Sequence, residues 1–394
     1  MTALLVKIDP SYAEFVDRNG TLVVELDMAL YGCVEAAALW HQDLSKTLVN
    51  FGYVRNPYDI CVFNKVDEAG VQSTIVLHVD DLLVTCVDER VIEELEACLR
   101  LAYPEITVRG GEVIGYLGMT FDFRVKGEVK VTMANTITEV LEGCGVTATR
   151  KTPATETLFD VREDSPLSSE ERRVWFHSNT AKMLYLAKRV KPECLTAVAF
   201  LTKRVQCCTV DDEAKLVRLL GYLRLTRDRG LVLRIGEHMS VSAYIDAAYG
   251  VHANGKSHTG SAIVLGEAAL ISAKSSGQNI VTKSSTEAEL VAVTDSVAQV
   301  IFVRNFVLAQ GYEVGPCVIY QDNMSCMALI KRGSPGSERS RHINIRHFWV
   351  SDRVADKEVI VRHLSTKDMF ANVLTKPLQG AQFCAERNEL TNWR

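Results

Sequence analysis

The chain has 394 residues, of which 47% are hydrophobic and 24% charged, and it includes 24 glycines and 9 prolines. This length predicts two to three domains, and the ordinary globular composition excludes global disorder and a fibrous structure. No apolar run approaches the roughly 20 residues of a membrane-spanning helix, and the first residues lack the apolar stretch of a signal peptide. We therefore expect an intracellular protein with no membrane partner.

Positive charge is concentrated in two segments, although the formal net charge of the whole chain is -5. Residues 182–234 hold twelve Lys or Arg and five acids, and residues 331–353 hold six Lys or Arg and two acids. A basic segment of this kind can follow the phosphate backbone of a nucleic acid, or it can be the solvated face of a helix. Both interpretations stay open for each segment.

The first third of the chain alternates apolar runs with short helical patterns. Its clearest feature is the segment 73–87, where two apolar halves flank Asp80 and Asp81, which predicts a β-hairpin with both carboxylates at its tip. The elements expected around it are helices at 36–51 and 89–101 and a strand at 116–123. The alternation of apolar segments stops over residues 151–170, which are rich in Thr, Pro, Ser and acids, and this composition is typical of a linker.

Helical periodicity returns over residues 171–234, together with the basic excess, and predicts an all-helical connector. From residue 239 onward, three strands are followed by alternating helices and strands, which indicates a mixed sheet with helices on its faces. The expected strands are 241–246, 260–265, 269–273, 317–322 and 359–364, and the expected long helix is 285–309. The predicted fold class is α/β (α+β), divided into domains 1–150, 151–237 and 238–394.

The adjacent acids Asp80 and Asp81 repel each other unless a cation lies between them. A solvent-screened turn explains the pair without any ligand, because Asp is common in turns. A metal site explains it as well, since the apolar flanks hold the tip rigid and Mg²⁺ prefers oxygen ligands. Two such ions can activate an attacking oxygen and stabilise a leaving one during phosphoryl transfer.

Three further acids are predicted at the ends of elements in the last third. Asp246 ends the first strand, Asp322 ends the fourth, and Glu289 lies in the opening turns of the long helix, after a capping box at 284–287. Strand ends and helix starts can converge at one edge of a sheet, where the sites of such folds usually lie. Each acid alone is more typical of a cap or a surface charge, whereas the three together favour a site. Asn372, in the segment 368–372, is a weaker fourth position.

Several motifs together resemble one family, the Pol polyproteins of copia-type LTR retrotransposons. Similarity to the ribonuclease H end rests on Tyr-Ile-Asp-Ala at 244–247, Ser-Ser-Thr-Glu-Ala-Glu at 284–289, Tyr-Gln-Asp-Asn at 320–323, Arg-His-Ile-Asn-Ile-Arg-His-Phe at 341–348 and Leu-Thr-Lys-Pro-Leu at 374–378. Similarity to the reverse transcriptase rests on Leu-Tyr-Gly at 30–32 with Trp40, His-Val-Asp-Asp at 78–81 and Tyr-Leu-Gly at 116–118. The resemblance covers nearly the whole chain in the family's order.

The resemblance implies a truncated reverse transcriptase palm, a helical connector and a ribonuclease H-like mixed sheet of five strands. It implies that Asp80 and Asp81 are metal-site carboxylates of the polymerase. The ribonuclease residues that it implies for Mg²⁺ or Mn²⁺ are Asp246, Glu289 and Asp322, with Asn372 as a weak fourth ligand.

The partners that the resemblance implies are an RNA–DNA hybrid, template nucleic acid and the rest of a Pol polyprotein, in a cytoplasmic particle or in the nucleus. The residues expected to contact nucleic acid are Lys188, Arg189, Lys203, Arg204, Arg341, His342 and Arg346. A basic surface histidine with no ligand explains His342 equally well.

The chain also departs from the family's pattern. In the family, the fingers and the first catalytic Asp of the polymerase lie upstream of the segment seen here, so we expect no polymerisation by this chain alone. His78 replaces a Tyr, and Glu35 places a carboxylate near the expected nucleotide pocket, where it would repel a triphosphate. Ala248 replaces a second Asp of the ribonuclease, and Asn372 replaces its fourth acid. Because Asn keeps an oxygen but loses the charge, metal affinity is expected to fall and to rise again in Asn372→Asp.

Three classes of function are compatible with these features. The leading one is a Pol fragment that hydrolyses the RNA strand of RNA–DNA hybrids. The second is a decayed, inactive copy that folds and only binds nucleic acid, and metal-dependent cleavage of a hybrid separates it from the first. The third is an integrase-like transposase, which DNA strand transfer would identify, but the chain lacks the His/Cys zinc cluster of retroviral-type integrases.

Overall fold

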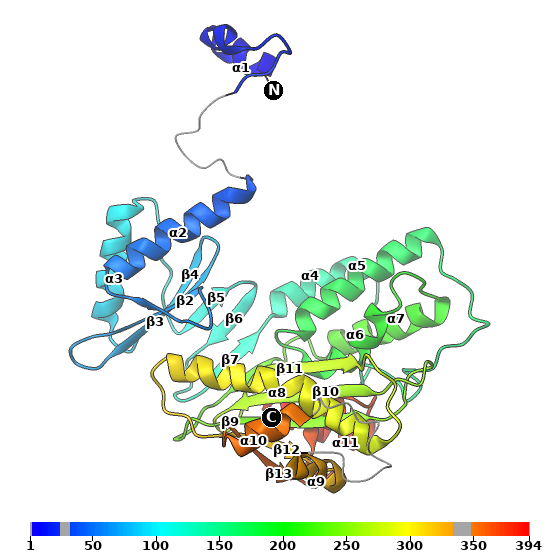
Figure 1. Cartoon of the computed structure of the whole chain (residues 1–394). Helices are drawn as coiled ribbons and strands as arrows, with labels where there is room; N and C mark the ends of the chain where they lie inside the picture. The colour runs from blue at the N-terminus through cyan, green and yellow to red at the C-terminus, as the bar shows by residue number, and fades with distance from the viewer. Residues whose placement is uncertain (1, 24–31, 334–347, 394) are drawn as a thin grey trace. The chain divides into compact units, whose positions relative to one another are not determined.

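A computed structural model describes residues 2–23, 32–333 and 348–393 of the chain (Figure 1). The chain forms two compact units, residues 1–107 and residues 108–394, which are described separately. Three residues expected to contact nucleic acid, Arg341, His342 and Arg346, lie outside the described residues.

The first unit contains a four-stranded antiparallel sheet in the order β1-β2-β3-β4. Its elements are α1 (Thr2–Ile8), the 3-10 helix η1 (Pro10–Phe15), α2 (Val34–Asn50), β1 (Val54–Arg55), β2 (Val62–Val66), β3 (Gln72–His78), β4 (Asp81–Thr85) and α3 (Glu89–Ala102). Leu44 and Leu48 of α2, Ile75 of β3 and Leu95 of α3 are buried in one apolar core. The helices α2 and α3 correspond to those expected at 36–51 and 89–101.

The expected hairpin is present as β3 and β4, which pair up to His78 opposite Asp81. Val79 and Asp80 form its two-residue turn, and Val79 has a φ of 55°, which β-branched residues rarely adopt. The indole nitrogen of Trp40, on α2, donates a hydrogen bond of 2.9 Å to the carbonyl of Val79. This contact helps to hold the tip in its unusual conformation.

The second unit begins with another antiparallel sheet, in the order β5-β6-β7-β8, together with a group of helices. These elements are β5 (Val113–Tyr116), β6 (Met119–Asp122), β7 (Val129–Thr132), α4 (Ala134–Cys144), α5 (Glu170–Ala187), the 3-10 helix η2 (Pro192–Cys194), α6 (Leu195–Thr202), α7 (Val210–Leu225) and β8 (Leu231–Leu233).

Two local expectations are wrong in this region. The single strand expected at 116–123 is a hairpin, because Leu117 and Gly118 both have positive φ, 50° and 74°, and reverse the chain between β5 and β6. The connector is not all-helical, because its last residues form β8 and complete the sheet by pairing with β7.

The pairing of β7 with β8 ties the segment before residue 150 to the connector. One apolar core includes Ile137 of α4, Phe176 of α5, Leu216 of α7 and Phe383 of α11 (Gly380–Thr391). The separation between the compact units therefore falls at 107/108, ahead of this shared core. The domain limits at 150/151 and 237/238 stay predictions.

The second sheet of this unit is mixed and has the order β11-β10-β9-β12-β13. β9, β10 and β11 are antiparallel, whereas β12 runs parallel to β9 and to β13. These elements are β9 (Val241–Ala248), β10 (His258–Leu265), β11 (Ala269–Gly277), α8 (Ser285–Ala309), β12 (Cys317–Gln321), α9 (Met324–Arg332), α10 (Trp349–Ala355), β13 (Val359–His363) and the 3-10 helix η5 (Phe370–Leu374). The predicted fold class, with a five-stranded mixed sheet flanked by helices, is confirmed.

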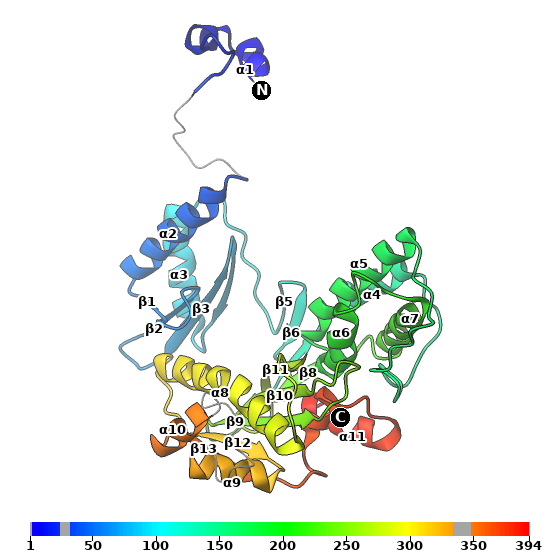
Figure 2. The same ribbon diagram turned by 45° about the vertical axis from the view of Figure 1, so that its right-hand side comes forward.

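The central strand β9 sends alternate side chains to two cores, as the period of a strand requires. Ala243 and Ile245 pack with the valines of α8, and Figures 1 and 2 both show this helix running along the sheet. Tyr244 belongs to the other core, where its ring centroid lies 4.1 Å from that of Phe370 in η5.

Helix α8 is the one described helix that is long and apolar enough to cross a membrane. Half of its most apolar window is buried inside the unit, and Val293, Val297 and Val300 are fully buried in the sheet core. Packing against the sheet therefore accounts for the apolar composition of this helix.

Candidate metal centre

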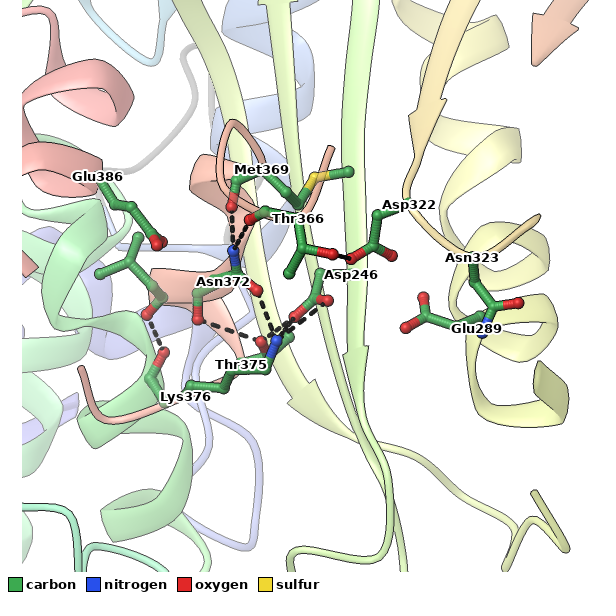
Figure 3. Close-up of polar contacts among 12 residues, drawn as sticks. Asp246, Glu289, Asp322, Asn323, Thr366, Met369, Asn372, Thr375, Lys376 and Glu386 are labelled. Carbon is green, nitrogen blue, oxygen red and sulfur yellow. Dashed lines mark hydrogen bonds and ion pairs between the residues drawn. The ribbon is translucent and has the colours of Figure 1, made fainter. Parts of the chain in front are cut away.

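Three acids from three separate elements meet at the carboxyl end of β12. Asp246 lies on β9, Glu289 lies on α8, and Asp322 directly follows β12, and one oxygen of each lies within 4.8 Å of the others (Figure 3). Asp246 and Glu289 are only 1% and 6% exposed, whereas Asp322 is partly exposed. Within residues 2–23, 32–333 and 348–393, this is the one group of three or more potential metal ligands.

The register of the sheet brings two of these acids together. β12 pairs with β9 only as far as Tyr320 opposite Tyr244. Asp246 and Asp322, each two residues further on, therefore both lie at the point where this pairing has ended. The expected convergence of the two acids is confirmed, but Asp246 does not end its strand as expected, because β9 continues to Ala248 in pairing with β10.

Glu289 enters the group from the first turns of α8, whose start is fixed by a cap. The hydroxyl of Ser284 accepts a hydrogen bond of 3.2 Å from the amide of Glu287, and the Glu287 carboxylate accepts one of 2.7 Å from the amide of Lys283. The expected capping box is thus present in a modified form, because the second bond reaches the residue before the cap. The cap sets the residue at which α8 begins and hence the turn on which Glu289 lies.

Hydrogen bonds orient the carboxylates of Glu289 and Asp322, and burial raises the pKa of Glu289. The side-chain nitrogen of Gln321 donates to Glu289 at 3.1 Å, and the hydroxyl of Thr366 donates to Asp322 at 2.8 Å. Burial, followed by the negative charge of Asp246, raises the pKa of Glu289 to about 8. Crowded carboxylates in a desolvated site are unfavourable unless a proton or a cation neutralises them. The donor set, all of it carboxylate oxygen, suits a hard divalent cation.

The opposite side of Asp246 faces a lysine. The Thr375 hydroxyl donates to one Asp246 oxygen, and the Lys376 ammonium lies 3.2 Å from that oxygen and 3.4 Å from the other. The same ammonium also donates to the side-chain oxygen of Asn372. In Figure 3, Asp246 lies between this group on one side and Glu289 with Asp322 on the other.

Asn372 is 2% exposed and is held by its own amide group. Its side-chain nitrogen donates to the backbone carbonyls of Thr366, at 3.1 Å, and of Met369. These bonds direct its oxygen toward Lys376, so the fourth ligand position expected from the sequence is in contact with an ammonium. The sequence motif at 374–378 contains Thr375 and Lys376, but its residue types alone indicated no role for them. Their separation from Asn372, about one helical turn, was the available signal.

The predicted polymerase acids lie in the first unit, at the exposed tip of the hairpin. Asp80 and Asp81 are both exposed, and in the part of the chain that the structure describes no third Asp, Glu, His or Cys joins them in a ligand group. The turn and the metal site both stay open as interpretations of this pair.

The predicted nucleic-acid contacts of the connector differ in their surroundings. Lys188 is exposed just after α5, and the guanidinium of Arg189 lies 3.7 Å from the ring centroid of Tyr185. Lys203 lies against Gly277 at the end of β11, and burial, followed by the charge of Lys256, lowers its pKa.

Arg204 is placed differently from the expectation. Its guanidinium donates to Asp212 at 3.0 Å, and the two side chains are only 20% and 3% exposed. Asp212 is also part of the capping box that starts α7 with Thr209. The charge of Arg204 is therefore used to neutralise a buried carboxylate.

Comparison with known proteins shows what the chain is similar to over most of its length. Residues 3–157 match the family model described as reverse transcriptase (RNA-dependent DNA polymerase). The chain is 26% identical over 375 residues to the Retrovirus-related Pol polyprotein from transposon TNT 1-94 of Nicotiana tabacum, which covers 93% of this chain and 28% of that protein. It is 27% identical over 375 residues to the corresponding polyprotein from transposon RE2 of Arabidopsis thaliana, covering 94% of this chain and 25% of the relative. The chain thus spans about a quarter of the length of these curated relatives.

Among solved structures, the chain is similar to the foamy viral protease-reverse transcriptase in complex with an RNA/DNA hybrid. The TM-score is 0.53 at 13% identity, and the match covers 91% of this chain and 43% of that one. At this identity the likeness shows the fold alone. Together with the sequence relatives, it confirms the predicted resemblance to copia-type retrotransposon Pol polyproteins, with a reverse transcriptase-like region over residues 3–157.

Proposed function

We propose that this chain hydrolyses the RNA strand of an RNA–DNA hybrid, with Mg²⁺ or Mn²⁺ bound by Asp246, Glu289 and Asp322. The observation that carries the proposal is the convergence of these three carboxylates, from β9, α8 and the end of β12, to within 4.8 Å of one another. Burial, followed by the charge of Asp246, raises the pKa of Glu289, and a dication would favour its charged form.

Three neighbouring residues orient the carboxylates that would hold such an ion. Gln321 and Thr366 fix the orientation of Glu289 and Asp322, and Thr375 fixes that of Asp246. A divalent ion, when bound, supplies the positive charge that activates a water molecule and stabilises the leaving oxygen of the phosphodiester. The partly exposed Asp322 leaves the site open toward solvent, from which a nucleic-acid strand can approach.

The nucleic-acid partner is supported by the exposed Lys188 and the partly exposed Arg189, and by the similarity in fold to a foamy viral enzyme whose structure is a complex with an RNA/DNA hybrid. The remainder of a Pol polyprotein is proposed as a further partner, because the chain spans about a quarter of its relatives. We propose no polymerisation by this chain alone, since Asp80 and Asp81 gather no third acid among the described residues.

The test is cleavage of a labelled RNA–DNA hybrid by the full chain, titrated with Mg²⁺ and with Mn²⁺. We expect metal-dependent cleavage of the RNA strand by the wild type and a loss of at least about 100-fold in Asp322→Asn, since the loss of even an outer-shell partner of a metal site costs 10–100-fold. The matched control is Asp295→Asn, which removes the same charge from the exposed side of α8 and should cleave like the wild type.

Two results would contradict the proposal. Equal cleavage by Asp322→Asn and wild type would show that the carboxylate group is not the site. Absence of cleavage at every metal concentration, with binding of the hybrid retained, would establish the alternative that Asn372 favours: a chain that binds nucleic acid without cutting it.

A further inference from the structure

The carboxylate of Asp246 has negatively charged groups on one side and a positively charged group on the other. On one side lie the acids Glu289 and Asp322. On the other lies the Lys376 ammonium, in contact with both oxygens of Asp246 and with Asn372 (Figure 3). Sites that use two divalent ions hold them about 3.5–4 Å apart, and a shared carboxylate between them is a natural bridging ligand.

We propose that the ammonium group of Lys376 takes the place of a second divalent ion beside Asp246, so that the site binds one divalent ion and not two. This inference rests on the proposed function, because it assumes that the three acids bind a metal. Lys376 is accordingly a positioning residue for Asp246.

The acceptors on this side of Asp246 suit an ammonium better than a dication. Lys376 offers three N–H donors, and it meets the two oxygens of Asp246 and the neutral oxygen of Asn372. Mg²⁺ requires near-octahedral coordination by about six oxygens, with carboxylates to balance its charge. One carboxylate and one amide supply little of that negative charge, and Glu289 and Asp322 lie on the far side of Asp246.

The amide of Asn372 is fixed in the orientation that serves the lysine. Its nitrogen is bonded to the carbonyls of Thr366 and Met369, so its oxygen is directed at Lys376. The backbone of Lys376 is fixed as well, because its amide donates to the carbonyl of Asn372 at 2.8 Å. The ammonium is therefore tethered beside its acceptors and competes intramolecularly with any ion from solution.

The experiment is a count of Mn²⁺ ions bound by the full chain, using titration calorimetry with electron paramagnetic resonance. The wild type is expected to bind one Mn²⁺ per chain at the site. Lys376→Met should bind a second one, and its first should bind more tightly by about tenfold or more, because a positive charge beside a shared ligand has been removed. Lys376→Arg keeps the charge and should stay at one.

The matched control is Lys367→Met, which removes an exposed lysine from the loop preceding η5 and should bind like the wild type. Circular dichroism checks that each variant is folded, and Lys376→Gln replaces Lys376→Met if the latter does not fold. Two Mn²⁺ ions in the wild type that are both lost in Asp322→Asn, or one ion with unchanged affinity in the folded Lys376 variants, would overturn the inference and leave the proposed function standing. No Mn²⁺ bound by the wild type, or binding undiminished in Asp322→Asn, would overturn the proposed function itself.

Discussion

At the scale of single residues, the same side-chain type has different consequences according to what surrounds it. In the sequence, Asn372 replaces an acidic metal ligand, and its amide oxygen is the one atom left that could bind a metal ion. In the structure its nitrogen matters as much, because it donates to two backbone carbonyls that a carboxylate would repel. Restoring the charge at this position therefore has a cost that the sequence does not reveal, and Lys376 would pair with the new carboxylate before a metal ion could.

Asn372→Asp is expected to lower the free energy of unfolding of the metal-free protein by about 2 kcal/mol, since the backbone carbonyls of Thr366 and Met369 lose their donor. Urea denaturation with a chelator present measures this change. Asn254→Asp is the matched control, because the exposed Asn254 uses only its side-chain oxygen, which accepts a bond from the amide of Lys256 that Asp can also accept. A variant at 372 as stable as the control would show that the amide bonds contribute little.

At the scale of elements, a basic segment separates into charges that are free to bind a partner and charges already used inside the fold. The excess over residues 182–234 is a single pattern in the sequence. Lys188 and Arg189, at the end of α5, remain accessible to a phosphate, whereas Arg204 neutralises Asp212 at the start of α7. The predicted nucleic-acid role is thus better supported for the end of α5 than for Arg204.

The double variant Lys188→Gln and Arg189→Gln is expected to flatten the plot of log binding constant against log salt concentration by about 0.9 for each phosphate that is no longer neutralised, measured on a duplex. Arg204→Gln should leave the slope unchanged and destabilise the fold by about 2 kcal/mol. This is less than the loss from a fully buried ion pair, because Thr209 still donates to Asp212. A flatter slope in Arg204→Gln, or an unchanged one in the double variant, would reverse this assignment.

At the scale of the whole molecule, the apolar cores divide the chain into compact units at a different point from the linker-like composition of the sequence. One apolar core lies wholly within residues 1–107, and two lie wholly within residues 108–394. The linker pattern at 151–170 suggested a boundary, but the chain on either side of it shares a core. Ile137, Val140 and Leu141 of α4 are at most 6% exposed there, and β7 pairs with β8.

Residues 108–394 expressed alone are expected to unfold cooperatively and to bind Mn²⁺ as the full chain does. A fragment starting at residue 151 loses β7 and the buried face of α4, at about 1.5–3 kcal/mol for each buried apolar side chain, which rivals the 5–15 kcal/mol stability of a whole domain. Urea unfolding of the two fragments compares them. A cooperative transition of equal stability in the shorter fragment would instead support the predicted limit at 150/151.

The sequence by itself determined the resemblance to retrotransposon Pol polyproteins, the fold class and the position of most elements, including the bounds of α8 and the hairpin carrying Asp80 and Asp81. These features depend on local periodicity, caps and turn residues, and on motifs that survive at about a quarter identity to the relatives. It also predicted that Asp246, Glu289 and Asp322 would converge, because the pattern placed each of them near the end of an element, although β9 runs two residues past Asp246. Only the tertiary structure decided that Lys376 contacts Asp246, that Arg204 neutralises Asp212 and that β8 completes the sheet of β5, β6 and β7. Each of these contacts joins residues through packing or pairing of separate elements, and no local pattern encodes which partner will be adjacent.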